Sequence, residues 1–147
     1  MNAGFIAAIV VGCAALIPSN LRLQETLRRV YPVEAVEYLR AHPMDVGMFN
    51  DDHWGGFLIL ALGPQHKVFI DGRLDIYEYA GVLADYVSIA RADQNTFALL
   101  RSYGISGCLL PRDNVLMGKL ANSPDWEKTY ENERSVIFKR KWLGSVR

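Results

Sequence analysis

The sequence predicts an α/β protein: a small three-layer sheet of three parallel strands plus an antiparallel C-terminal hairpin, preceded by one N-terminal transmembrane helix. Two short apolar runs, at residues 46–49 and 67–70, are each closed by polar loop residues, which is typical of buried strands. An apolar stretch without strand alternation separates them and predicts a crossover helix. An uncharged stretch at the start of the chain predicts the transmembrane helix.

Residues 1–21 carry no charged side chain, and no polar stripe interrupts the apolar residues from 3 to 18. A helix of about 20 residues spans the hydrocarbon core of a bilayer, so this segment is just long enough. A secretory signal peptide would begin with basic residues, which are missing here, and a buried core helix is rarely free of polar residues over such a length. We therefore interpret residues 1–21 as a single transmembrane helix.

The charge is unevenly placed although the formal net charge is zero. Arg22, Arg28 and Arg29 stand against Glu25 in residues 22–30, which we interpret as a basic juxtamembrane linker. Residues 31–138 hold 9 basic and 15 acidic side chains, so an acidic body lies between basic ends. This pattern argues against nucleic acid as a partner and favours membrane lipid. If the helix is the only span, the positive-inside rule leaves the body in the cytoplasm.

The body is predicted to cover residues 31–141, with a tail at 142–147. It opens with a helix at residues 32–42, because Pro32 suits a first helical turn and Pro43 ends the pattern. The strand at 46–49 follows, then the crossover helix at 54–62, which starts at Gly55-Gly56 and stops at Gly63-Pro64. The strand at 67–70 completes a right-handed parallel unit.

The second half of the body supplies the remaining elements. Residues 76–91 and 94–103 predict one or two further helices, and residues 105–110 predict a third strand. A helix is expected at 115–121. Two strands at 126–130 and 135–139, joined by a polar turn, are expected to form the closing hairpin.

The candidate binding residues lie in the loops after the first two strands, because ligands of open α/β sheets gather outside the carboxyl ends of strands. These residues are Asn50, Asp51, His53, Trp54, Asp71, Arg73, Asp75 and Tyr77. If the two strands are neighbours, Asp51 and Asp71 approach one another with His53 and Arg73 in reach. Such a group resembles a site for a divalent ion or a polar headgroup.

A structural alternative explains the same acidic residues. Asp51 or Asp52 would cap the following helix, while Asp71 and Arg73 would pair and fix the turn at Gly72. This alternative is favoured over the ligand site, because acidic residues next to turns and basic residues mostly cap helices or form pairs.

Recognised catalytic patterns are missing from the sequence. No glycine-rich phosphate loop, Gly-x-Ser-x-Gly elbow or His-Glu-x-x-His motif occurs. Cys13 and Cys108 stand in different apolar environments and offer neither a disulfide framework nor a ligand set. We therefore expect no catalytic residues, no metal ligands and no cofactor.

The segments FND at 49–51, WGGFL at 54–58, KVFIDGR at 67–73 and DIY at 75–77 resemble the C-terminal soluble region of large bacterial multi-spanning membrane proteins. Those proteins in turn resemble membrane-embedded glycosyltransferases that use lipid-linked sugars. The resemblance extends from about residue 32 to residue 140. It implies a terminal fragment or truncated homologue, with residues 3–18 as the last span and the body on the extracytoplasmic face.

The catalytic acidic residues of such transferases lie in loops near the first spans, which this chain lacks. The resemblance therefore implies a membrane-tethered, non-catalytic accessory domain whose partner is a multi-spanning membrane protein. The alternative is a free-standing, membrane-anchored module that binds a divalent ion or a carbohydrate. A stand-alone hydrolase that uses Asp51 and Asp71 is disfavoured, because no nucleophile or matched general base is identifiable.

Overall fold

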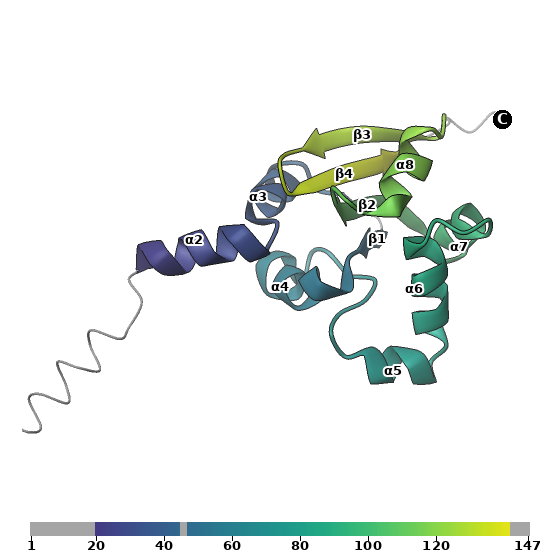
Figure 1. Ribbon diagram of the computed structural model, residues 1–147, viewed down its shortest axis with the longest axis horizontal. Helices are drawn as coiled ribbons and strands as arrows, with labels where there is room; N and C mark the ends of the chain where they lie inside the picture. Colours follow the sequence, from purple (N-terminus) through teal and green to yellow (C-terminus); the bar gives the residue numbers. More distant parts are fainter. Residues whose placement is uncertain (1–19, 45–46, 142–147) are drawn as a thin grey trace, which may run out of the picture. The chain divides into compact units, whose positions relative to one another are not determined.

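The structure is a computed structural model that describes residues 20–44 and 47–141 (Figure 1). The chain divides into two compact units, residues 1–31 and residues 32–147. The described part of the first unit holds one helix, α2 (Asn20–Val30). The predicted transmembrane helix at residues 3–18 and the tail at 142–147 lie outside the described residues.

No helix in the described ranges combines the length and the apolar character needed to cross a bilayer. This finding contradicts the single-pass membrane localisation and the transmembrane helix of the predicted fold. The longest helices there, α2 and α4 (Asp52–Leu62), have 11 residues each. A helix of that length rises about 16 Å, roughly half the hydrocarbon thickness.

The second unit alternates helices and strands along the chain. Its helices, besides α4, are α3 (Val33–Ala41), α5 (Leu74–Tyr79), α6 (Val82–Ala90), α7 (Thr96–Ser102) and α8 (Val115–Ala121). Its strands are β1 (Gly47–Asn50), β2 (Ile105–Pro111), β3 (Trp126–Glu131) and β4 (Ser135–Arg140). These bounds confirm a helix at each of the predicted ranges 32–42, 54–62 and 115–121, a strand at 105–110 and the closing hairpin, each to within a few residues.

The sheet is mixed, with the strand order β1-β2-β4-β3. Strand β1 pairs with β2 in parallel, whereas β2 with β4 and β4 with β3 pair antiparallel. The prediction of three parallel strands is therefore wrong. Residues 67–70 form no strand, and Val68 makes one isolated parallel bridge to Met48.

The side chain of Asn50 explains why the ladder stops after that bridge. Its Oδ1 accepts a hydrogen bond from the Phe69 N–H at 2.8 Å, and its Nδ2 donates to the Ile70 carbonyl at 2.8 Å. A side-chain amide thus satisfies backbone groups that a regular strand would pair with backbone. Residues 67–70 still run beside β1, but hydrogen bonds from the Asn50 side chain take the place of a backbone ladder between the two segments.

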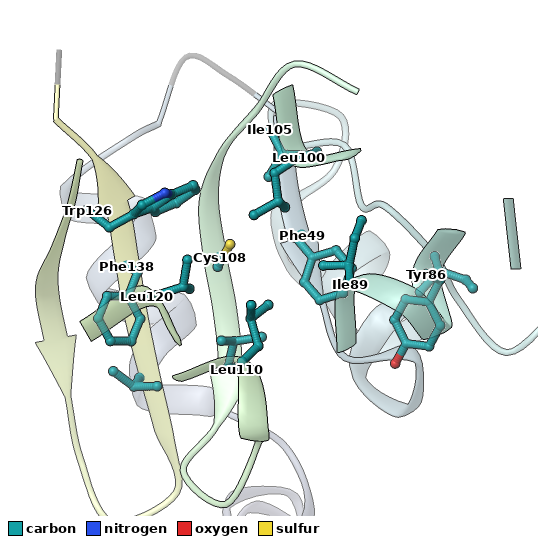
Figure 2. Packing of buried hydrophobic residues seen from close by; sticks show 13 residues of the cluster. Phe49, Tyr86, Ile89, Leu100, Ile105, Cys108, Leu110, Leu120, Trp126 and Phe138 are labelled. Atoms are coloured by element: carbon teal, nitrogen blue, oxygen red, sulfur yellow. The ribbon is translucent and has the colours of Figure 1, made fainter. Parts of the chain in front are cut away.

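Helices cover both faces of the sheet. The main apolar cluster runs from Trp126 and Phe138 on the hairpin to Phe49 on β1 and Tyr86 on α6 (Figure 2). Helices α6, α7 and α8 contribute to this cluster. Buried residues that alternate with it along the strands, such as Leu109 and Ile137, face the opposite side, because side chains of a strand alternate. Helix α3, which packs on β3, β4 and α4, covers that side.

The predicted helical stretch at 76–91 is divided into α5 and α6 at Gly81. Gly81 has a φ of 75°, in the left-handed region that a residue with a Cβ atom adopts only with strain. This turn ends α5 after six residues and changes the chain direction, so that α6 buries Tyr86 and Ile89 in the core.

Candidate functional site

The end of β1 passes directly into α4 through a capping aspartate. The Asp51 carboxylate accepts a hydrogen bond from the His53 N–H at 3.1 Å, so Asp51 is the N-cap and α4 begins at Asp52. The capping alternative is therefore confirmed for Asp51. The helix therefore starts earlier than predicted, and the glycines at 55 and 56 lie inside it, not at its boundary.

Asn50, a predicted binding residue, is fully buried and fully engaged. Besides its two bonds to Phe69 and Ile70, its Nδ2 donates to the Asp51 carbonyl at 2.8 Å. Its amide therefore joins the loop after β1 to the loop after residue 70. These three hydrogen bonds make Asn50 a structural link between the two predicted loops.

Asp51, Asp52 and His53 form a compact group of metal-ligand type. One ligand atom from each residue lies within 4.8 Å of the others. The His53 Nδ1 lies 2.9 Å from Asp52 Oδ1 and 3.3 Å from Asp51 Oδ1, and the imidazole is 84% exposed. Within the described residues, these three are the group whose geometry could hold a metal ion.

Electrostatics couples the three groups. The negative charges of Asp52 and then Asp51 raise the pKa of His53 above its ordinary value. Burial, followed by the charge of Asp52, raises the pKa of Asp51, and hydrogen bonds and charge from His53 oppose that rise. The two carboxylates therefore make His53 hold its proton more strongly than an isolated histidine side chain in water does.

Tyr86 of α6 also belongs to this site, although it is not among the residues predicted from the sequence. Its ring stacks on Phe49 with the centroids 5.5 Å apart, at one end of the apolar cluster (Figure 2). Its hydroxyl donates to Asp52 Oδ1 at 3.0 Å and accepts from the Asp52 N–H at 3.2 Å. Burial raises the pKa of Tyr86 well above its ordinary value. A buried tyrosine needs a partner for its hydroxyl, and that requirement was the signal available in the sequence.

Asp71 and Arg73 form the structural pair that the alternative interpretation predicted. Asp71 is buried, and its Oδ1 accepts from the Arg73 N–H at 3.0 Å and from Nε at 2.9 Å. Its Oδ2 accepts from Arg73 Nη2 at 2.6 Å, which makes the pair bidentate. The hydrogen bonds from Arg73 hold the pKa of Asp71 below its ordinary value, and the Tyr77 hydroxyl acts in the same direction.

Helix α4 lies against the backbone just before this pair. A Cβ atom placed on Gly55 would lie 2.2 Å from the Ile70 carbonyl oxygen and 2.6 Å from Asp71 Cα. Nothing lies within 4 Å of the same position at Gly56. The glycine at 55 therefore permits a backbone contact that positions Asp71, whereas the glycine at 56 faces open space.

Of the remaining predicted residues, Tyr77 packs half-buried against the apolar cluster and its hydroxyl reaches the Asp71 and Arg73 pair. The other two lie apart from the pair, since Trp54 is buried on α4 and Asp75 is exposed in the first turn of α5. The residues predicted to form a single site therefore form two separate groups. One is the Asp51, Asp52 and His53 group, and the other is the Asp71 and Arg73 pair, with Asn50 linking their loops.

Helix α5 follows the Asp71 and Arg73 pair at once and buries none of its residues. Ile76 is 57% exposed and Tyr79 is 97% exposed, and Leu74 is exposed as well. Figure 1 shows α5 joined to α6 and away from the β3 and β4 hairpin. Within the described residues, this short helix is therefore held in place with its apolar side chains uncovered.

Comparison with known proteins found that no family model, no curated protein and no solved structure matches this chain. The resemblance to the C-terminal region of multi-spanning membrane proteins therefore stays a prediction.

Proposed function

We propose that this chain is a non-catalytic accessory domain that docks through α5 on a partner protein of a glycosyltransferase-like assembly. The observation that carries the proposal is that α5 is fixed in position yet presents its apolar side chains to solvent. The anchoring of α5, its exposed surface and the use of the nearby carboxylates each support it.

A six-residue helix is not stable by itself in water, because helix nucleation is unfavourable. Here the chain enters α5 from the turn that the Asp71 and Arg73 pair fixes, and α5 packs on α6. The helix is thus preorganised, and a partner would not have to supply the free energy of ordering it. Preorganised surfaces bind more tightly than flexible ones of equal area.

The exposed side chains of α5 have the chemistry of an interface core. Leu74, Ile76 and Tyr79 are apolar or aromatic, and covering one such side chain fully contributes about 1.5 to 3 kcal/mol. Tyrosine is enriched among residues that dominate binding energies. Asp75 and Glu78 flank these residues on the same helix. The complementary surface on the partner is therefore apolar with basic groups at its edge.

The carboxylates that acid and base chemistry would use are engaged in holding the loops. Asp71 binds Arg73, Asp52 binds the Tyr86 hydroxyl, and Asp51 caps α4. These bonds support a structural role for the three carboxylates, and those of Asp71 to Arg73 fix the turn that leads into α5. The resemblance described above supplies the class of partner, a multi-spanning glycosyltransferase-like membrane protein.

We expect a gene for a multi-spanning protein beside the gene for this chain, and its absence there would contradict the proposal. The binding test then co-purifies the chain with that protein. The double variant Ile76→Ser, Tyr79→Ser is expected to weaken the association roughly 10- to 100-fold, since interface residues of this kind each contribute more than about 1 kcal/mol. The matched control is Leu60→Ser, Val115→Ser, because those side chains are 86% and 68% exposed on α4 and α8. Equal losses in both double variants, or no loss in the first, would show that α5 is not the docking element.

A second candidate function, binding of a divalent ion, is favoured by the Asp51, Asp52 and His53 group. Its mixed carboxylate and imidazole ligands suit Mn²⁺ or Zn²⁺ better than Ca²⁺. Calorimetry with Mn²⁺, Zn²⁺, Ca²⁺, Mg²⁺ and simple sugars tests it, with His53→Gln as the variant, because His53 is exposed. If the wild-type protein gives no binding heat with any ligand of the panel, this candidate function is wrong.

A further inference from the structure

Helix α4 is apolar on all sides, although only one side of it is buried. Residues 54–62 carry no charged side chain. Trp54 and Leu58, which share one face at i and i+4, are buried in the fold. Ile59 and Leu60 lie on the opposite face and are both exposed, Leu60 almost fully. A helix that is apolar all round is normally covered on every side, so this face indicates a further contact.

The exposed face of α4 is symmetric about its centre. Gly56 lies one turn before Leu60 and Gly63 one turn after it, and both glycines are exposed. A Cβ atom on Gly56 would meet nothing within 4 Å. Two such helices that run antiparallel, with a two-fold axis between Ile59 and Leu60, place Ile59 opposite Leu60 and Gly56 opposite Gly63 of the other copy. Glycines let a second helix backbone approach closely, so the face is complementary to itself.

The two ends of α4 differ in charge. At its start, Asp51 and Asp52 carry two negative charges against at most one positive charge on His53. At its end, Arg40 of α3 donates to a carbonyl of the last turn at 2.8 Å and remains positively charged, and the exposed Lys67 follows. Antiparallel pairing brings the acidic end of each copy beside the basic end of the other, whereas parallel pairing brings like charges together. A second copy of the chain therefore matches this face in both shape and charge.

We propose that two copies of this chain associate through α4, with the helices antiparallel and Leu60 near the two-fold axis. The pairing covers apolar side chains that the fold leaves in water. Two helices of 11 residues form a small interface, so the association is weak and depends on protein concentration. It uses no residue of α5 and is therefore tested separately from docking on the partner protein.

Sedimentation of the full chain over a range of concentrations tests the proposal. We expect the wild type to associate as its concentration rises, and Leu60→Ser to weaken the association at least about 100-fold, because each dimer loses two covered leucines. The matched control Val115→Ser removes an exposed apolar side chain of α8 and is expected to associate as the wild type does. All variants share residues 1–19, so the differences between them report α4. A wild type that stays monomeric, or equal association of Leu60→Ser and the wild type, would overturn the proposal.

Disulfide crosslinking tests the antiparallel arrangement in a Cys13→Ser background, where the remaining Cys108 is buried. Leu60→Cys places its two thiols near the two-fold axis, so we expect a disulfide-linked dimer. In Gly56→Cys the two thiols are separated by about seven residues along the helices, roughly 10 Å, which is more than a disulfide spans. This variant is expected to remain unlinked. Equal yields from the two variants, including none from either, or a dimer from Gly56→Cys alone, would contradict the pairing.

The partner protein that α5 is proposed to bind is the competing occupant of this face. We expect Leu60→Ser to leave co-purification with that protein unchanged. If Leu60→Ser weakens co-purification as much as Ile76→Ser, Tyr79→Ser does while self-association persists, the face belongs to that partner and the proposed pairing is wrong.

Discussion

Asn50 uses its side-chain amide as a substitute for a backbone peptide group. It accepts from Phe69 and donates to Ile70 and Asp51, inside a fully buried environment. Hydrogen bonds of this kind are individually modest, but a buried partner left without one is costly. A single side chain thus keeps the two loops of the candidate site together.

We expect Asn50→Ala to lower the free energy of unfolding by about 2 to 4 kcal/mol, because it leaves the Phe69 N–H and the Ile70 carbonyl without their bonds to Asn50. Urea unfolding measures the loss. The matched control is Asn122→Ala, whose exposed amide donates to one carbonyl within its own helix end, and it should cost less than about 0.5 kcal/mol. Similar values for the two variants would mean that Asn50 does not link the loops.

His53 provides the pH-dependent prediction. Because Asp52 and Asp51 raise its pKa, we expect an NMR titration to place the midpoint above the ordinary 6.5. Asp52→Asn should lower that midpoint more than Asp51→Asn, since Asp52 is the largest contributor. The exposed Asp113→Asn is a control that should leave it unchanged. A midpoint at or below 6.5 would contradict the cluster geometry.

The sign of the linked stability follows from the same shift. A group whose pKa rises on folding stabilises the folded state fully below its unfolded pKa, and this contribution is lost as pH rises through the folded pKa. For His53 the loss therefore begins near pH 6.5 and is complete above the raised value. Asp71 behaves in the opposite way, because its lowered pKa gives stability that is lost as pH falls through that value.

At the scale of single residues, the sequence predicted contacts between near neighbours in the chain but missed contacts between distant ones. Capping by Asp51 and pairing of Asp71 with Arg73 were both predictable, because each depends on neighbours within two residues. The link from Asp52 to Tyr86 joins residues 34 positions apart and depends on how α6 packs on β1. Local patterns do not encode such a distance.

At the scale of elements, the two neighbouring glycines of α4 have opposite roles. Gly55 brings the helix backbone against Ile70 and Asp71, whereas Gly56 faces solvent. This contact and the Asp71 and Arg73 pair together hold the turn before α5. The Gly-Gly step was interpreted from the sequence as a helix start, but both glycines lie inside the helix.

We expect Gly55→Ala to destabilise the protein by about 2 to 4 kcal/mol, because its Cβ would overlap backbone atoms that cannot move independently. Gly56→Ala should be neutral or stabilise the protein by up to about 1 kcal/mol, since alanine favours an exposed helix interior. Chemical denaturation of the pair measures both effects. If the two variants are equally stable, α4 does not touch the loop at Gly55.

Elements with a strong local pattern were predicted well, including the closing hairpin and the helix at 115–121. Residues 67–70 have the apolar composition of a strand, and they lie beside β1 as expected. They fail to form a ladder because a side chain, Asn50, occupies the bonding positions. The sheet was therefore predicted with one parallel strand too many.

At the scale of the whole molecule, the acidic body and the basic helix α2 present different surfaces. No helix of the described residues is long and apolar enough to cross a bilayer, which contradicts the predicted single-pass localisation. The exposed apolar side chains of α5 could not be inferred from the sequence, because the same residues would look like a core-facing helix. Only the packing shows that this helix is left uncovered.

The most direct test of docking through α5 is site-specific photocrosslinking in cells that produce the chain together with the multi-spanning protein that we expect to be encoded beside its gene. A photoreactive amino acid replaces Tyr79 on α5 in one variant and Glu133, an exposed residue of the hairpin turn, in the other. We expect an adduct of the two proteins from position 79 and none from position 133. An adduct from position 133 alone, or equal yields from both positions, would contradict docking through α5.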